Sequence, residues 1–131
     1  MDKLLKNQAA ELRKMSSEAA VVWLIDNYPI DNIEYGNAFM LMSHRSWKKS
    51  DQTSLAEYYL QKMPFSNSKA YEAILSFMSL SIFLKVVRDF LPLNSSSDVD
   101  LLIYHLKPVL ESKVKSSKDS EMIEEFFSGI S

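Results

Sequence analysis

The chain has 131 residues, 47% of them hydrophobic, and a net charge of −2, which suits a single globular domain. It contains no cysteine, which excludes disulfides and thiolate metal sites. With only two glycines it has almost no means of building a phosphate-binding loop or a nucleophile elbow.

Apolar residues recur with the helical period from the start of the chain. The pattern predicts a first helix over residues 4–15 and a second that restarts at Ser16 and ends before Pro29. A third helix is expected over residues 32–44, where it is apolar nearly all round and therefore deeply buried. Close packing of this helix against a neighbour would explain Gly36 in its interior.

The fourth helix is expected to begin at a cap formed by Ser50 and Asp51 and to end at Pro64. A break over residues 66–68 is followed by further helical periodicity up to Pro92.

The remaining chain contains one loop, residues 94–97, which closes with a capping-box pattern at Ser97. This loop is too short to mark a domain boundary. A helix through residues 101–106 follows, which Pro108 must kink or end, and the last helix lies around residues 122–127.

These elements predict an all-α fold, with residues 1–131 forming a single domain of seven or eight short helices. Short paired helices in this order are compatible with an irregular bundle and with a short α-solenoid. The sequence leaves both arrangements open.

Residues able to perform chemistry are few. The two histidines, His44 and His105, lie far apart in the sequence, and no HExxH, GxSxG or Walker motif is present. Asp98 and Asp100 lie two positions apart at a helix start, so they are typical of caps rather than metal ligands. We therefore expect no enzyme activity, no cofactor and no metal.

One basic segment contains an aromatic residue, with Arg45, Lys48 and Lys49 around Trp47. Such a corner could stack a base and neutralise phosphate, which suggests an RNA-binding regulator or helical adaptor as an alternative function. The structural interpretation is that Trp47 folds onto the core. Acidic residues nearby favour the structural interpretation, and nucleic acid is not the expected partner.

The C-terminal part carries the acidic excess, because residues 91–131 contain seven acidic and four basic side chains. In the last helix Glu121, Glu124 and Glu125 fall on the face opposite its apolar residues, which predicts an acidic outer surface. Tyr58 and Tyr104 project away from the apolar stripes of their helices, and exposed tyrosines are typical interface anchors. These five residues are the candidate partner-binding set.

The middle of the chain also resembles a known class of proteins. The segments that carry the likeness are HRSWKKSDQ (44–52), LAEYYL (55–60), MPFSNSKAYE (63–72) and FMS (77–79). They are similar to small helical immunity proteins of bacterial contact-dependent growth inhibition and related polymorphic toxin systems. No catalytic motif is part of the likeness.

The resemblance implies a cytoplasmic protein, encoded beside a toxin, that binds the C-terminal toxin domain one-to-one and blocks its active site. Such toxin domains are often basic nucleases, for which an acidic helix face would mimic phosphate. A cytoplasmic protein with no membrane partner is also expected from the early charges at the N-terminus and from the longest relevant uncharged run, twelve residues over 73–84.

Overall fold

A computed structural model describes residues 2–130 of the chain. Within this range there are eight α-helices, one short 3-10 helix and no strand. The elements in chain order are α1 (Lys3–Lys14), α2 (Ser17–Asn27), α3 (Asn37–Met42), α4 (Lys49–Tyr59), the 3-10 helix η1 (Leu60–Lys62), α5 (Lys69–Leu75), α6 (Leu80–Arg88), α7 (Ser96–Ser112) and α8 (Ser117–Ser128).

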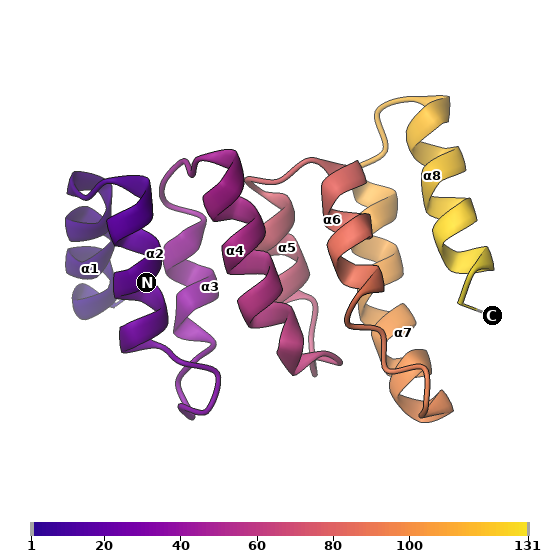
Figure 1. The fold of residues 1–131 in the computed structure, drawn as a ribbon, viewed down its shortest axis with the longest axis horizontal. Helices are drawn as coiled ribbons and strands as arrows, with labels where there is room; N and C mark the ends of the chain where they lie inside the picture. Colours follow the sequence, from indigo (N-terminus) through magenta and orange to yellow (C-terminus); the bar gives the residue numbers. More distant parts are fainter. Residues whose placement is uncertain (1, 131) are drawn as a thin grey trace.

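The helices form two layers that alternate along the chain. Helices α1, α3, α5 and α7 pack in one row and α2, α4, α6 and α8 in the other, each helix against the one two places before it (Figure 1). Helices α1 and α8 therefore lie at opposite ends of the stack. The all-α prediction is confirmed, and of the two arrangements left open the helices adopt the short α-solenoid.

Side-chain caps fix the starts of five helices. Asp2, Ser16, Ser79, Ser95 and Ser116 each accept a hydrogen bond from the backbone N–H three residues later. Such caps satisfy backbone donors that the first turn of a helix cannot pair internally. The predicted start at Ser16 is confirmed, and the cap at Ser79 separates α5 and α6.

The third helix is shorter than predicted, because the chain forms turns before α3 begins. The Asn32 side chain accepts a hydrogen bond from the Glu34 N–H at 2.7 Å, and backbone bonds there join residues three apart. Asparagine side chains compete with the helical pattern in this way. The expected close packing at Gly36 is also wrong, since a Cβ added there would meet no atom within 4 Å.

Two predicted caps are displaced by two residues. Helix α4 starts at Lys49, and its N-cap residue Lys48 forms no side-chain cap. The backbone N–H of Lys48 donates to the Ser17 hydroxyl at 3.0 Å, and this contact between distant segments holds the chain where α4 begins. Helix α7 is capped by Ser95 instead of Ser97. It also continues through Pro108 to Ser112, because Val109 and Leu110, directly after the proline, are buried in the core.

The core runs through both layers without interruption. It contains two fully buried tyrosines, Tyr59 and Tyr71. The Tyr59 hydroxyl donates to the backbone carbonyl of Tyr28 at 2.8 Å and lies 3.3 Å from that of Leu24, so it ties α4 to the end of α2. The Tyr71 hydroxyl has no hydrogen-bond partner of good geometry among the described residues. Within residues 2–130, no helix combines the length and apolar character that crossing a bilayer requires.

We expect removal of the hydroxyl to change the free energy of unfolding differently at the two core tyrosines. Tyr59→Phe leaves the Tyr28 carbonyl without its buried partner and should lower the free energy of unfolding by about 1–2 kcal/mol. Tyr71→Phe removes a polar group that gains little from the fold, so it should be neutral or stabilising. Urea unfolding of both variants tests this, and equal losses of stability would contradict it.

Alkaline pH should destabilise the fold through the same pair. Burial raises the pKa of Tyr71 from 10.0 to about 12 and raises that of Tyr59 as well. Above pH 10 these tyrosines therefore lose their protons in the unfolded chain and retain them in the folded chain. Their effect on the free energy of unfolding is negligible below pH 10, and that free energy falls as the pH rises towards 12. The slope is about 1.4 kcal/mol per pH unit for each tyrosine. Urea titrations at alkaline pH should show it, and Tyr71→Phe should reduce the slope; an unchanged slope in that variant would contradict the assignment.

Candidate protein-binding surface

Helix α8 presents the acidic outer face that the sequence predicts. Glu121, Glu124 and Glu125 are exposed, whereas Ile123 and Phe126 are only 6% and 1% exposed and anchor the helix to the stack. None of the three carboxylates forms an ion pair or hydrogen bond within the described part of the chain. Their charge is thus available to a partner.

Tyr104 is also confirmed as an exposed aromatic residue. It lies on α7 and is 74% exposed. Among the described aromatic rings it contacts only that of its neighbour His105, edge-on at a centroid distance of 5.0 Å. A tyrosine so placed offers apolar area and a hydroxyl without reorganisation of the fold.

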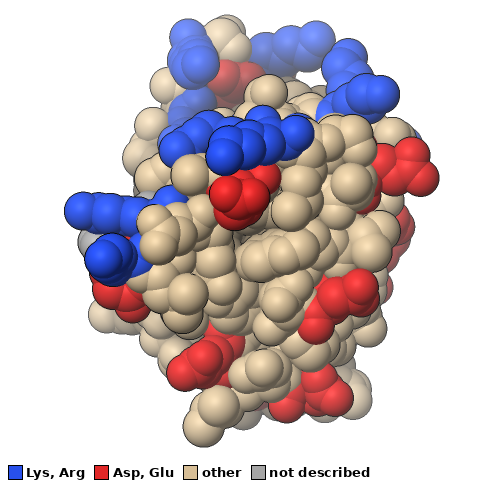
Figure 2. Space-filling model, turned by 90° about the vertical axis from the view of Figure 1, so that its left-hand side faces the viewer, with Lys and Arg blue, Asp and Glu red and all other residues tan. Residues whose placement is uncertain are grey.

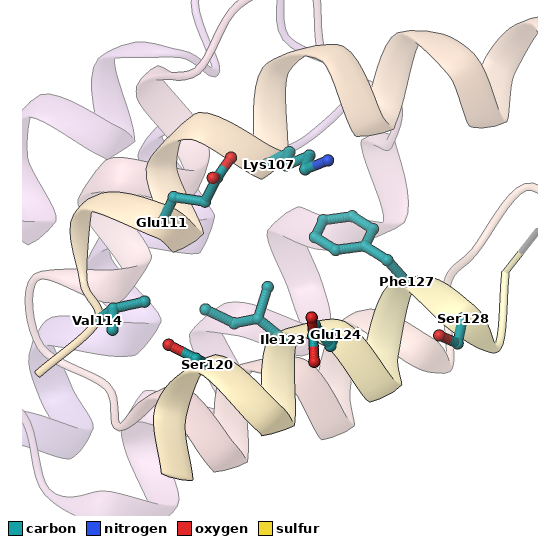
Figure 3. A pocket seen from close by; sticks show the side chains of 8 residues that line it. All are labelled: Lys107, Glu111, Val114, Ser120, Ile123, Glu124, Phe127 and Ser128. Atoms are coloured by element: carbon teal, nitrogen blue, oxygen red, sulfur yellow. The ribbon is translucent and has the colours of Figure 1, made fainter. Parts of the chain in front are cut away.

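An open groove of about 890 Å³ separates the end of α7 from α8. Figure 3 shows side chains from both helices directed into this space. We call it the C-terminal groove, and its lining consists of Lys107, Glu111, Val114, Ser120, Ile123, Glu124, Phe127 and Ser128.

Tyr104 lies on α7 one turn before the groove lining and lines a separate pocket with Glu72 of α5. Tyr104, Lys107 and Glu111 follow each other at helical spacing on α7, so they lie on one stripe that leads into the groove. Glu111 lies two turns beyond Tyr104, about 10 Å along the helix axis. We call the groove together with the exposed Glu121 and Glu125 of α8 the C-terminal surface, and Tyr104 lies beside it on α7.

Sequence reasoning missed Glu111 as a member of this surface. The prediction that Pro108 kinks or ends its helix removed the reason to place later residues on the same stripe. The sequence signal that could have identified Glu111 is the apolar pair Val109 and Leu110, because two apolar residues directly after a proline favour a helix that continues in the core. In the structure these two residues are 5% and 0% exposed.

Tyr58 is not the freely exposed anchor that the sequence predicts. It is half-buried on α4, its hydroxyl accepts a hydrogen bond from the Ile30 N–H at 2.9 Å, and its ring packs edge-on against Tyr59 at 4.9 Å. The projection that pointed Tyr58 away from its own helix stripe took no account of the loop after α2, which covers it. Tyr58 holds this loop and does not line the C-terminal groove.

The basic corner is used for structure. Trp47 is 5% exposed, and its indole Nε1–H donates to the Met42 carbonyl at 2.8 Å. Arg45 Nη1 donates to the carbonyls of Leu12 and Met15 at 2.7 and 3.0 Å, and its guanidinium lies 4.7 Å from the Trp47 ring centroid. The interpretation that Trp47 folds onto the core is confirmed, so its ring is not available to stack on a base.

Charged side chains of both signs cover the opposite end of the stack. Figure 2 shows the α1 and α2 end, where Lys and Arg side chains gather towards the top and carboxylates lie lower. Helix α1 has Arg13 and Lys14 in its last turn, where cations meet the negative end of the helix dipole favourably, and Lys14 also pairs with Glu11 at 3.5 Å.

The histidines do not form a site with each other or with carboxylates. His44 is exposed just after α3, and His105 is half-buried on α7. Among the described residues no group of three or more His, Asp or Glu side chains could hold a metal ion. Asp98 lies in the first turn of α7, where a carboxylate stabilises the helix dipole.

Comparison with protein-family models, with curated proteins and with solved structures finds no match for this chain.

Proposed function

We propose that this protein is a bacterial immunity protein that binds a cognate toxin domain one-to-one in the cytoplasm and blocks its active site. The resemblance of residues 44–79 to immunity proteins of contact-dependent growth inhibition and related systems supports this role. The observation that carries it is the C-terminal surface, where exposed carboxylates without ionic partners adjoin an open groove and an exposed tyrosine.

The charge of this surface suits a basic toxin domain. A nuclease must attract a phosphate backbone and therefore has a positive active-site region. Glu121, Glu124 and Glu125 place three negative charges on consecutive turns of one rigid helix, as a phosphate mimic requires. Charges of this kind also accelerate association, because opposite potentials steer the partners together.

An inhibitor of this kind needs no catalytic groups of its own. It acts by occupying the toxin, so a stable fold and a complementary surface suffice. Repeated helix pairs supply both, because stacked pairs share a continuous core while their outer faces remain available for binding.

Calorimetric titration tests this proposal with the purified C-terminal domain of the polypeptide encoded immediately upstream. We expect one site per toxin domain and a dissociation constant in the nanomolar range or below, about −12 kcal/mol. The variant Lys48→Glu/Lys49→Glu is the control, because both lysines are exposed away from the C-terminal surface and their change should leave the affinity within about threefold. Absence of binding by the wild-type protein would contradict the proposal.

A further inference from the structure

The C-terminal groove lies at the end of the helix stack. Helices α5 and α6 are each covered by a helix two places later, namely α7 and α8. Helices α7 and α8 have no such successor among the described residues. If the contacts between helices two places apart continued, one more helix would pack against α7 at this position. Figure 1 shows α7 and α8 at this end of the stack, and Figure 3 shows the side chains that line the groove between them.

The lining of the groove is apolar at its floor and acidic at its rim. Ile123 is 6% exposed, Phe127 is half-buried and Val114 is 37% exposed. Glu111 from α7 and Glu124 from α8 are exposed on either side. This is the pattern that receives an amphipathic helix, whose apolar stripe fills a groove while its flanking charges meet the rim.

Charge complementarity identifies the helix that fits. The groove has two carboxylates and one ammonium group, that of Lys107, whose Nζ lies 6.0 Å from the Phe127 ring centroid. Glu121 and Glu125 add negative charge along α8, whereas Lys113, Lys115 and Lys118 lie at the connection between α7 and α8, at one end of the groove. A helix with Lys or Arg flanking its apolar stripe is therefore favoured, and a second copy of this surface is disfavoured because a two-fold contact would bring like charges together.

We propose that the C-terminal groove is the docking site for a basic amphipathic helix of the partner protein. The helix places apolar side chains at positions i, i+3 or i+4 and i+7 over Ile123 and Phe127, with its cations against Glu111 and Glu124. This inference rests on the proposed function for the identity of the partner, a toxin domain. The preference of the groove for a basic helix is a property of this chain alone.

Two double variants separate the groove from the general charge of the surface. Glu111→Lys/Glu124→Lys reverses the rim, and Glu34→Lys/Glu57→Lys makes the same change in net charge on exposed residues far from the groove lining. A third variant, Ser120→Trp, fills the groove with a bulky ring, and Ser117→Trp is its control because Ser117 is exposed on the same helix outside the lining.

The probe is a fluorescein-labelled peptide of about 18 residues with a leucine stripe flanked by lysine, compared with a twin flanked by glutamate. Fluorescence anisotropy should show the lysine peptide binding the wild type at least about tenfold more tightly than its twin, with that preference reversed by Glu111→Lys/Glu124→Lys. The Glu34→Lys/Glu57→Lys variant should retain the preference, and Ser120→Trp should abolish binding where Ser117→Trp does not. Equal effects of the two double variants, or amide NMR shifts confined to other helices, would overturn the proposal.

The toxin domain then distinguishes the two proposals. If it binds the wild type, and the rim variant and Ser120→Trp bind equally well, the groove is not the docking site and the immunity function stands. If the lysine peptide binds in the groove but the toxin domain does not bind at all, the proposed function fails and the helix preference of the groove stands.

Discussion

The triple variant Glu121→Lys/Glu124→Lys/Glu125→Lys will bind the toxin domain at least about a hundredfold more weakly than the wild type, with its fold intact. Each substitution replaces an attraction to a basic partner with a repulsion, and like-charge contacts across an interface cost several kcal/mol together. Binding by the wild type should weaken as salt rises, because attraction between exposed charges is screened. The variant should lose that dependence or reverse it.

The fold should tolerate the three changes. The carboxylates are exposed and form no ion pair or hydrogen bond within residues 2–130, and Glu121 and Glu125 already repel each other one turn apart. The control is Asp26→Lys/Glu34→Lys/Glu57→Lys, which gives the same net charge on exposed residues of other elements. Titration calorimetry at two salt concentrations compares the three proteins. Unchanged affinity and salt dependence in the α8 variant would refute the role of the acidic face.

Trp47→Ala will lower the free energy of unfolding by about 3–5 kcal/mol. The substitution removes a side chain that is 5% exposed and packs against Phe77 at a ring-centroid distance of 6.3 Å. It also leaves the Met42 carbonyl without its indole donor and the Arg45 guanidinium without its aromatic platform. Such a loss is a large part of the 5–15 kcal/mol that stabilises a typical domain.

This variant also separates the two functions considered for the basic corner. If the corner bound RNA through Trp47, the substitution would abolish RNA binding and leave the protein folded. The observed packing instead predicts that the substitution lowers the stability of the fold. Lys48→Ala/Lys49→Ala is the control, because both side chains are exposed and the change should alter stability by no more than about 0.5 kcal/mol. Urea unfolding with circular dichroism measures both. A Trp47→Ala protein as stable as the wild type would contradict the structural role.

Periodicity and capping chemistry predicted the helices well where local sequence and packing agree. Ser16 caps α2 as predicted, because the residues after it are both helix formers and core residues. Predictions were wrong where a contact between distant segments decided the outcome. The Ser17 hydroxyl holds the Lys48 N–H and moves the start of α4, and buried residues carry α7 through Pro108 at the expense of one helical hydrogen bond.

The candidate surface was also predictable only where local sequence determines it. The exposed face of α8 follows from the spacing of its residues alone, so Glu121, Glu124 and Glu125 could be placed from the sequence. The groove could not, since it depends on how α7 and α8 diverge at the end of the stack. The half-buried state of Tyr58 depends on the Ile30 N–H, which lies 28 positions away in the chain.

Growth of bacteria that produce the upstream-encoded toxin domain, with and without this protein, decides whether the protein confers immunity. We expect that the toxin domain alone arrests growth and that co-expression restores it, with the two proteins purifying as a one-to-one complex. A harmless toxin domain, or growth arrest that co-expression does not relieve, would contradict the immunity function.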